Sequence, residues 1–415
     1  MEETEISFWV GIDWGSETHQ ACVLRGNREV VEERSFAHSG KAIAEFVASL
    51  LERVGGDGAR VAVGIETPRG SIVETLLDRG VRVFAVNPKQ LDRFRDRHTV
   101  AGAKDDRRDA FVLADSLRTD RPLFREVRLG DPRVVELREL VRVHEDLVAE
   151  RVALGNRLHA QLNRFYPQIL ALGSVHEESW LWALLQRAPT PAEGGRLSVA
   201  KIGSVLKAHS IRRWAPEKVR EILREPALHV APGVEQAARA HISKLLPRIR
   251  LVHEQLKDCA REIETILDEL AEPEDDAERR GHRDVTILRS LPGVGIIVSA
   301  TMLAEAHEPL ATRDYTSLRA LCGAAPVTHQ SGKRLSTSMR RACNGRLRNA
   351  TYHFAMSSVQ KDERTKAHYA ALRAKGHSHG RAIRGVVDRL LQVLIAMLKQ
   401  GTLFDAEKRR PAAAA

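Results

Sequence analysis

Cysteine and aromatic residues are scarce in this sequence of 415 residues. The chain has four cysteines, and aromatic residues make up 5% of it. Cys22, Cys259, Cys322 and Cys343 include no CxxC pair, and the chain is far longer than the small secreted domains that disulfides hold together. We therefore expect reduced thiols and a cytoplasmic protein.

Long apolar runs and nucleotide-binding loops are also missing. The most apolar late stretch, residues 386–398, is interrupted by Asp388, Arg389 and Gln392, whereas a transmembrane helix needs about 20 apolar residues. The first residues, MEETEISFWV, lack the basic and apolar regions of a signal peptide. No Walker loop and no GxGxxG motif occurs in the sequence. We expect a soluble protein without such a phosphate loop.

Acidic residues are nearly absent from one segment near the C-terminus. Residues 333–384 contain 13 Lys or Arg against two acids, Asp362 and Glu363, so this segment carries +11 while the whole chain carries +10. Clustered Lys and Arg predict a polyanionic partner, because neutralising phosphates releases counterions. A solvated helical surface is the alternative, although such a surface usually intersperses acids. The candidate nucleic-acid contacts are Lys333, Arg334, Arg340, Arg341, Arg346 and Arg348.

Short apolar and alternating runs dominate the beginning of the chain. We predict strands at residues 7–14, 19–25, 28–36, 60–66 and 81–86. We predict helices at residues 41–51, 71–79 and 105–117. Three strands followed by alternating helices and strands is the order of the ribonuclease-H-like α/β fold. The order predicts such a domain at residues 1–125.

Two long helical tracts follow, at residues 137–165 and 242–270. Apolar residues recur in steps of three, four or seven in the first tract. In the second tract the steps alternate between three and four, which is the heptad pattern of a coiled-coil seam. We expect Pro247 to kink or start the second helix. The seam can pack within the chain or against a second subunit, and the sequence leaves both open.

The tracts also indicate the domain organisation after the α/β domain. Residues 170–235, between them, hold three tryptophans with several Pro and Gly, which predicts a small helical insertion with its own core. We predict a helical coiled-coil region at residues 126–283 and a mostly helical C-terminal domain at residues 284–405. The fold class is thus α/β plus α.

Four carboxylates stand out in the first domain. Asp13 ends a predicted strand in VGIDWG, Glu66 ends another in VGIET, and Asp106 and Asp109 share a helix face in KDDRRDA. Acids that meet at strand ends are costly unless cations neutralise them, and their oxygens suit Mg²⁺ or Mn²⁺. Two such ions can activate the attacking oxygen and stabilise the leaving one in phosphodiester chemistry. Singly, each acid could be a cap or a surface ion pair, and Asp105 could replace Asp106.

The C-terminal region holds two further motifs. Residues 288–306, LRSLPGVGIIVSATMLAEA, resemble a helix-hairpin-helix that presents backbone N–H groups to phosphate, or form an ordinary turn between packed helices. Ser331 lies in the basic stretch HQSGKR. Its hydroxyl could attack phosphorus while cations stabilise the transition state, or it could be a turn residue or phosphate contact. Ser336 and Ser338 are neighbouring candidates.

Together these motifs resemble the DEDD transposases of insertion sequences, in the family numbered one hundred and ten, which includes bridge-RNA-guided recombinases. VGIDWG, GIETPRG, KDDRRDA, ILRSLPGVG, CGAAPVTHQSGK and the basic segment occur in the order that this family shows. The resemblance covers nearly the whole chain. The sequence departs from the pattern at His307-Glu308, where Gly-Asp is expected, and at Pro247.

The resemblance implies a RuvC-like metal-binding domain, a coiled coil and a C-terminal transposase domain with a catalytic serine. It implies Mg²⁺ (or Mn²⁺) as cofactor, donor and target DNA and a noncoding guide RNA as partners, and a homo-oligomer, dimer or tetramer, at the prokaryotic nucleoid. In related members, carboxylates and serine from different subunits complete one site. Carried over by motif, the metal ligands and catalytic acids are Asp13, Glu66, Asp106 and Asp109, and the nucleophile is Ser331.

The expected reaction is excision and insertion of the protein's own mobile element through a phosphoserine intermediate. A metal-only endonuclease of the Holliday-junction type, with water as nucleophile, is the first alternative. A sugar kinase or actin-like ATPase, suggested by GIDWGS, needs a second Asp-Gly phosphate loop and a Gly-rich adenosine site, and neither occurs. A non-catalytic nucleic-acid-binding protein would require only the basic segment.

Overall fold

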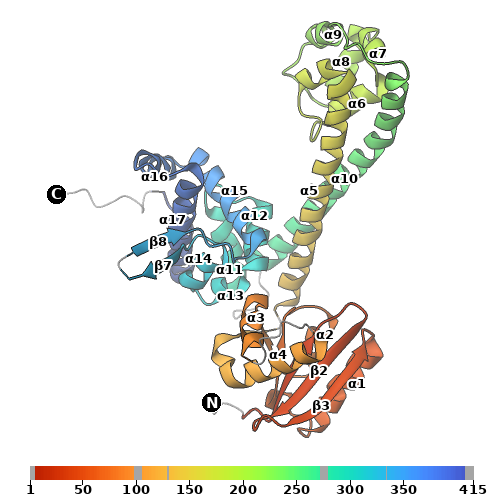
Figure 1. Ribbon diagram of the computed structural model, residues 1–415. Helices are drawn as coiled ribbons and strands as arrows, with labels where there is room; N and C mark the ends of the chain where they lie inside the picture. Colours follow the sequence, from red (N-terminus) through yellow and green to blue (C-terminus); the bar gives the residue numbers. More distant parts are fainter. Residues whose placement is uncertain (1–4, 98–104, 129, 272–278, 333, 407–415) are drawn as a thin grey trace, which may run out of the picture. The chain divides into compact units, whose positions relative to one another are not determined.

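The computed structural model describes residues 5–97, 105–128, 130–271, 279–332 and 334–406. The chain forms two compact units, Met1–Asp131 and Pro132–Ala415 (Figure 1). The first unit is mixed α/β and the second is almost wholly helical, which confirms the predicted class of α/β plus α. Among the described residues, no helix is long and apolar enough to cross a membrane.

A six-stranded sheet forms the first unit, in the order β3-β2-β1-β4-β5-β6. The strands are β1 Phe8–Asp13, β2 Thr18–Arg25, β3 Val30–Ala37, β4 Val61–Ile65, β5 Arg82–Ala85 and β6 Arg125–Val127. β1, β2 and β3 form an antiparallel meander, whereas β1, β4 and β5 are parallel. The five predicted strands are confirmed. The antiparallel edge strand β6 has only three residues, too few for an alternating pattern that predicts a strand.

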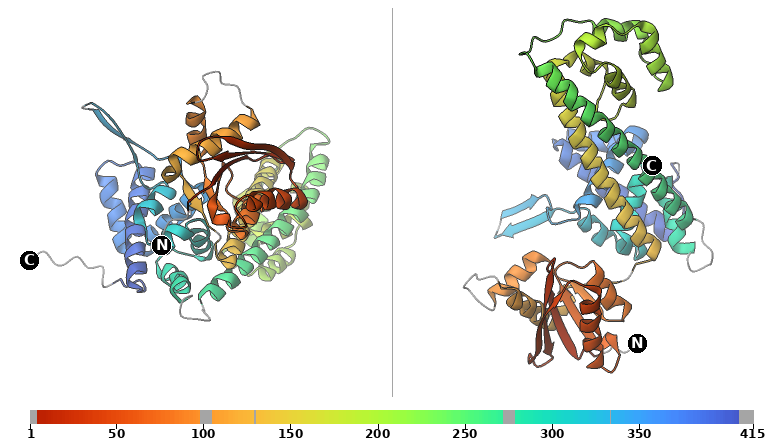
Figure 2. Two further views of the ribbon diagram at one scale, coloured as in Figure 1. Left: turned by 90° about the horizontal axis from the view of Figure 1, so that it is seen from below. Right: turned by 90° about the vertical axis from the view of Figure 1, so that its right-hand side faces the viewer.

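Helices cover both faces of this sheet (Figures 1 and 2). They are α1 Gly40–Glu52, α2 Ser71–Asp78, α3 Pro88–Asp96 and α4 Asp106–Asp120, joined in part by the 3-10 turns η1 Gly58–Arg60 and η2 Arg121–Leu123. Val10 and Ile12 of β1 share a core with α1 and α2. Cys22 and Leu24 of β2 face α4 instead. Successive strand residues point to opposite faces, so Gly11 and Asp13 lie on the α4 side.

Two glycines let α4 lie directly on the central strands. A Cβ atom at Gly11 would be 1.9 Å from the carbonyl oxygen of Ala110, and one at Gly64 would be 3.2 Å from that of Leu113. Near the other end of α4, Arg118 donates to the carbonyl oxygen of Gly26 at 3.2 Å. Gly26 directly follows Arg25, which pairs with the first residue of β1. The first turn of α4 therefore lies toward the carboxyl ends of β1 and β4.

We expect Gly11→Ala to destabilise the first unit by about 3 kcal/mol, near the upper end of ordinary overpacking. The added methyl group would overlap the backbone of α4. Urea denaturation measures the change. Gly40→Ala is the matched control, because nothing lies within 4 Å of a Cβ atom there. Equal losses of stability in both variants would contradict the close packing of α4 on β1.

Two long helices, α5 Pro132–Phe165 and α10 Val234–Ala271, run side by side in the second unit (Figures 1 and 2). The apolar seam of α10 is buried against α5, where Leu137 shares a core with Cys259 and Ile263. Both predicted tracts are helices, and their seam packs within one chain.

Pro247 lies inside α10 and does not start it, so that part of the prediction is wrong. Its side chain is exposed, and the carbonyl group that loses an N–H partner can bind water instead. Leu245, Leu246 and Ile249 remain buried on either side. Their packing holds the helix together across the proline.

The chain between α5 and α10, residues 166–233, forms a small helical module that we call the tip module. Its elements are η3 Pro167–Leu172, α6 Ser179–Arg187, α7 Pro191–Gly195, α8 Val199–Ala208 and α9 Pro216–Leu223. Trp180 and Trp182 are buried in its core, and the Trp182 indole N–H donates to the Val175 carbonyl at 2.7 Å. This core continues along the adjoining ends of α5 and α10.

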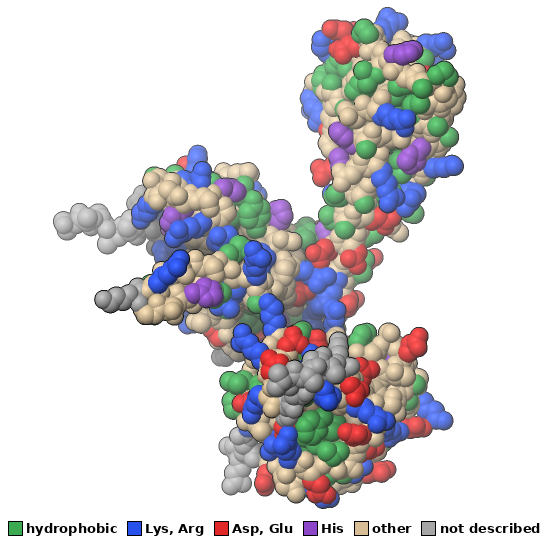
Figure 3. All heavy atoms as spheres, viewed as in Figure 1, with side chains coloured by type: hydrophobic (Ala, Val, Ile, Leu, Met, Phe, Trp, Pro, Cys, Tyr) green, Lys and Arg blue, Asp and Glu red, His purple; other side chains and the backbone are tan. Residues whose placement is uncertain are grey.

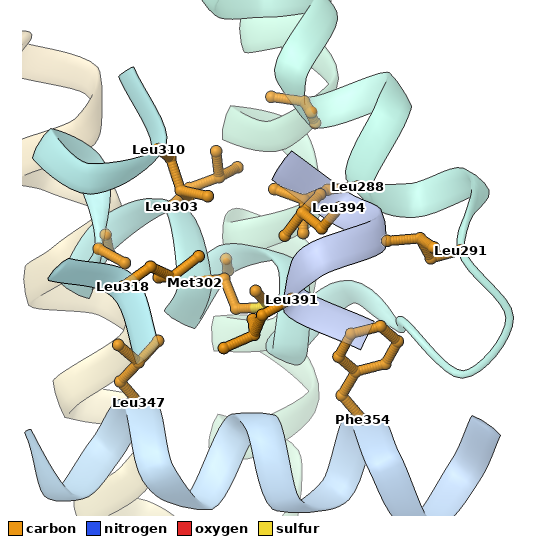
Figure 4. Packing of buried hydrophobic residues seen from close by; sticks show 14 of the residues in the cluster. Leu288, Leu291, Met302, Leu303, Leu310, Leu318, Leu347, Phe354, Leu391 and Leu394 are labelled. Atoms are coloured by element: carbon orange, nitrogen blue, oxygen red, sulfur yellow. The ribbon is translucent and has the colours of Figure 1, made fainter. Parts of the chain in front are cut away.

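The remaining residues, 279–406, form the C-terminal body. Its elements are α11 Arg279–Ser290, α12 Ile296–Glu305, α13 His307–Ala311, α14 Tyr315–Leu321, β7 Val327–Ser331, β8 Arg334–Ser338, α15 Gly345–Lys361, α16 Glu363–Ala374 and α17 His379–Gln400. Leu288, Leu303, Phe354 and Leu391 bring four of these helices to one apolar core (Figure 4).

Candidate active site

Asp13 and Glu66 end neighbouring parallel strands. Asp13 is the last residue of β1, Glu66 directly follows β4, and the residues before them, Ile12 and Ile65, are paired. In VGID and VGIE, each acid lies two residues beyond a glycine that faces α4, so strand alternation places both acids on the α4 side. Both side chains are partly buried. Two carboxylates thus lie at the edge of the sheet where α4 begins.

The first turn of α4 carries the other acids. Asp105 is the N-cap, and its side chain accepts a hydrogen bond from the backbone N–H of Arg107 at 3.3 Å. Asp106 is exposed, whereas Asp109 is 1% exposed. Because capping occupies Asp105, Asp106 is the better candidate for a metal ligand.

Arg95 of α3 holds Asp109. Its Nε and Nη2 atoms donate to the two carboxylate oxygens of Asp109 at 2.5 and 2.6 Å, and its Nη1 atom donates to Asp92 at 2.5 Å. The hydrogen bond to Asp109 is the main cause that raises the pKa of Arg95 against the effect of burial, and the charges of Asp109, Asp92 and Glu66 add to it. The guanidinium group therefore offsets the charge of the acids.

The four acids have the oxygen ligands that a divalent metal ion prefers, but their side chains are not arranged as a complete metal site in the described structure. Carboxylate oxygens are the donors that Mg²⁺ and Mn²⁺ bind, and the elements that carry the acids converge. In the described part of the chain, however, no three His, Cys, Asp or Glu side chains are grouped to hold an ion. Both oxygens of Asp109 are bound by Arg95. An ion that uses Asp109 must therefore compete with Arg95 for these oxygens.

We expect Arg95→Ala to lower stability by about 3 kcal/mol without metal, because it leaves the buried Asp109 carboxylate unpaired. Saturating Mn²⁺ should then raise the Tm of this variant more than that of the native protein, since the ion no longer competes with a guanidinium. Thermal unfolding with and without Mn²⁺ measures both effects. Arg97→Ala is the control, because Arg97 pairs with Asp120 instead. Equal Mn²⁺ shifts in all three proteins would contradict competition at Asp109.

Arg95 is the residue of this site that the sequence patterns do not reveal. Leu91 is the one buried residue in the nine-residue helix α3, so no apolar period marks it. The helix does have a start signal, because Asn87 caps it and Pro88 is its first residue. That dipeptide could predict the helix, but not the pairing of Arg95.

Ser331 lies at the turn of the β7–β8 hairpin. It pairs with Arg334 across the turn, and Gly332 there takes a φ of 55°. Lys333 lies outside the described residues. The side chain of Ser331 is exposed, and the hairpin projects from the C-terminal body (Figures 1 and 2). A substrate can therefore reach the hydroxyl group from outside.

The neighbouring serines have different surroundings. Ser338 Oγ lies 3.3 Å from Nε2 of His329, and Ser336 is paired with His329 across the strands. Within the described residues, no side-chain base forms a hydrogen bond with Ser331. A base for Ser331 must therefore come from elsewhere. His329 is a second residue that the motifs did not single out, although strand pairing of HQS with LSTS would have placed it opposite a serine.

The candidate nucleic-acid contacts divide into two groups. Arg334 and Arg341 are exposed, and their side chains have no hydrogen bond or ion pair to the described protein. Arg340 and Arg348 instead donate to backbone carbonyl groups, and Arg346 forms an ion pair with a glutamate of α5 at 2.5 Å. Figure 3 shows Lys and Arg side chains gathered over the C-terminal body. Arg334 and Arg341 are therefore the most available of these side chains for phosphate.

The predicted helix-hairpin-helix consists of α11, a tight turn and α12. Gly293 in this turn has a φ of 98°, and a Cβ atom there would be 2.6 Å from the backbone nitrogen of Ser358. Ser358 Oγ also donates to the Pro292 carbonyl at 2.5 Å. The turn thus packs against α15. This close packing explains why residue 293 is glycine, and no bound phosphate is needed to explain it. Phosphate binding by the turn stays a prediction.

Two family models match the two regions that carry these residues. One, a DEDD-type model of IS110 described as a transposase, matches residues 10–167. The other, described as the transposase IS116/IS110/IS902 family, matches residues 285–370, and together they cover more than half of the chain. This chain belongs to the IS110 family of transposases.

Individual relatives agree with this assignment. The mini-circle putative transposase for IS117 of Streptomyces coelicolor is 29% identical over 98% of both chains. The IS110 43.6 kDa protein of the same species is 26% identical over 99% of this chain and 98% of its own. A putative transposase of Sinorhizobium fredii, y4uE, is 45% identical, but the match spans 56% of this chain and 63% of the relative. The resemblance drawn from the motifs is confirmed, and the enzyme is a DNA transposase.

The two matched regions of this transposase contain all of its candidate catalytic residues. All four candidate carboxylates lie in the first matched region, and Ser331 lies in the second. The tip module falls almost wholly between them. The candidate chemistry thus lies within the two matched regions, whereas nearly all of the tip module lies outside them.

Proposed function

We propose that this transposase excises and inserts its own insertion sequence by DNA strand exchange through a covalent phosphoserine intermediate, guided by a noncoding bridge RNA. The observation that carries the proposal is the convergence of Asp13, Glu66 and the first turn of α4 at the carboxyl ends of two parallel strands. The strand order of the first unit supports a ribonuclease-H-like, RuvC-like domain. In such a site, acids at strand ends would hold the metal ions that promote phosphodiester chemistry.

Asp13, Glu66, Asp106 and Asp109 would hold Mg²⁺ or Mn²⁺, with Arg95 withdrawn from Asp109. When bound, such ions position the scissile phosphate and neutralise the charge that develops on it. Asp106 is exposed at the helix start and needs no rearrangement of the core to take part.

Ser331 would make the bond. Its Oγ attacks phosphorus, the Oγ–P bond forms as the bond from phosphorus to the leaving strand oxygen breaks, and that oxygen takes a proton. The serine proton passes to a base. The free hydroxyl end of the exchange partner then attacks the same phosphorus and gives up its proton. A new phosphodiester bond forms as the Oγ–P bond breaks, and the Ser331 oxygen takes back a proton. Arg334 and Arg341 would offset the added charge on phosphorus.

The proposed site is assembled from two subunits. Ser331 lies on an exposed hairpin and has no base partner in the described chain. Carboxylates of a second copy would supply that missing function, so the active species is a homo-oligomer. DNA of donor and target would then lie between the basic hairpin of one copy and the acids of the other.

Reconstitution tests the proposed function. The purified protein, its noncoding RNA and DNA carrying donor and target sites should give recombinant joints, and omission of RNA or chelation of metal should abolish them. Nucleic-acid binding without any strand breakage under these conditions would instead indicate a non-catalytic protein.

A metal-only endonuclease is the second candidate, and the absence of a base beside Ser331 among the described residues favours it. Water would then attack phosphorus, and Ser331 would only contact phosphate. Such an enzyme would release free DNA ends and would make no recombinant joint.

A further inference from the structure

A cavity between the tip module and α10 takes no part in the proposed chemistry. The cavity has a volume of about 780 Å³ and lies where α6 and the end of α8 meet α10. Arg187 ends α6, His209 follows α8, and Arg250, His253 and Lys257 project from α10. Three cationic side chains and two histidines from three helices thus line one cavity.

Positive charge in this cavity is poorly compensated. Its acid, Glu254, is 3.2 Å from Lys257 and pairs with it. Arg250 donates to the neutral amide oxygen of Gln186 at 2.6 Å. Neither Arg187 nor Arg250 forms an ion pair anywhere in the described part of the chain. Two guanidinium groups therefore face the cavity without a counter-charge.

The two histidines of the cavity are held by the protein. His209 Nδ1 lies 3.0 Å from Ser179 Oγ, and His253 packs edge-on against Trp182 with ring centroids 5.1 Å apart. Burial, followed by the charges of Arg250 and Arg187, lowers the pKa of His209. The Nδ1 atom of His253 is buried and has no hydrogen-bond partner. The side chains around the two arginines are thus held in place, and fixed guanidinium donors suit an anion.

We propose that this cavity binds a backbone phosphate of nucleic acid, with Arg187 and Arg250 as its main contacts. Guanidinium groups match phosphate oxygens in charge and geometry. The site would bind the backbone rather than stack a base, because the indole of Trp182 is buried and its N–H is already bonded. The proposal takes from the proposed function only that the partner is nucleic acid.

This contact lies outside the regions matched by both family models, residues 10–167 and 285–370. It would therefore add a nucleic-acid contact that is separate from the four carboxylates and from Ser331. Backbone phosphates of either nucleic acid offer the same chemistry, and binding measurements can distinguish the two sources.

The test compares the Arg187→Gln/Arg250→Gln double variant with the native protein. Fluorescence anisotropy measures the affinity of each for labelled bridge RNA and for labelled duplex target DNA, at several salt concentrations. Affinity falls as salt rises, so the slope of log affinity against log salt is negative. Loss of one phosphate contact should make this slope shallower by about 0.7 to 0.9. Arg196→Gln/Lys201→Gln is the matched control, because both residues are exposed in the tip module and do not line the cavity.

A reduced slope in the cavity variant alone supports the proposal, and the nucleic acid that shows it identifies the source. Unchanged slopes for both nucleic acids, or equal reductions in the control, overturn it. Thermal unfolding checks that the variants remain folded. Failure of strand exchange by the native protein would count against the proposed function and leave this result unaffected.

Discussion

We expect Ser331→Ala to reduce strand exchange by at least about 10⁴-fold, because removal of a nucleophile removes the covalent route itself. RNA and DNA affinity should stay within about twofold. The serine hydroxyl is exposed and makes no hydrogen bond with the described residues, so its loss should cost little stability. A reconstituted exchange assay, with anisotropy on the same preparation, measures both quantities.

The hairpin offers matched controls for this variant. Ser336→Ala and Ser338→Ala remove the same atom from β8, the exposed partner strand of the hairpin, and both should retain exchange. Ser338 is the stringent control, because its hydroxyl lies beside His329 and has a base within reach. Loss of exchange in Ser338→Ala with normal exchange in Ser331→Ala would move the nucleophile to Ser338.

We expect Glu66→Gln to reduce metal-dependent exchange by roughly 10³-fold. The change keeps the shape of the side chain and removes its charge and one oxygen donor. Glu66 is only partly buried, so the fold should tolerate it. Exchange rates over a range of Mg²⁺ and Mn²⁺ concentrations measure the loss.

Asp105→Asn is the control for Glu66→Gln, because asparagine caps a helix as well as aspartate does. Its exchange rate should stay near the native rate. Asp109→Asn is a poorer test, since it also disrupts the buried pair with Arg95 and would confuse loss of catalysis with loss of stability. A native rate in Glu66→Gln would exclude Glu66 from the site.

The sequence predicts much of the first unit for a physical reason. Strand alternation places Gly11 with Asp13, and Gly64 with Glu66, on one face. The tetrapeptides VGID and VGIE repeat that arrangement on adjacent strands. The acids and the helix that packs over them are therefore encoded locally. The pattern itself is local, whereas the contact of the two glycines with α4 depends on a distant part of the chain.

Tertiary packing decides what the sequence does not predict. Arg95 acts through a helix with one buried residue, and its partner Asp109 lies 14 residues away. The seam of α10 has the same heptad pattern whether its partner is α5 or another chain. Pro247 is tolerated because residues on both sides of it are buried against other elements. None of these outcomes is visible in local periodicity.

The most direct measurement is a search for a protein-linked DNA end. A target DNA nicked beside the exchange point would let the short released fragment diffuse away, so the cleaved intermediate would accumulate. We expect a covalent adduct that mass spectrometry locates on the peptide containing Ser331, and that disappears in Ser331→Ala. Cleaved DNA with free ends and no linked protein would contradict the serine mechanism.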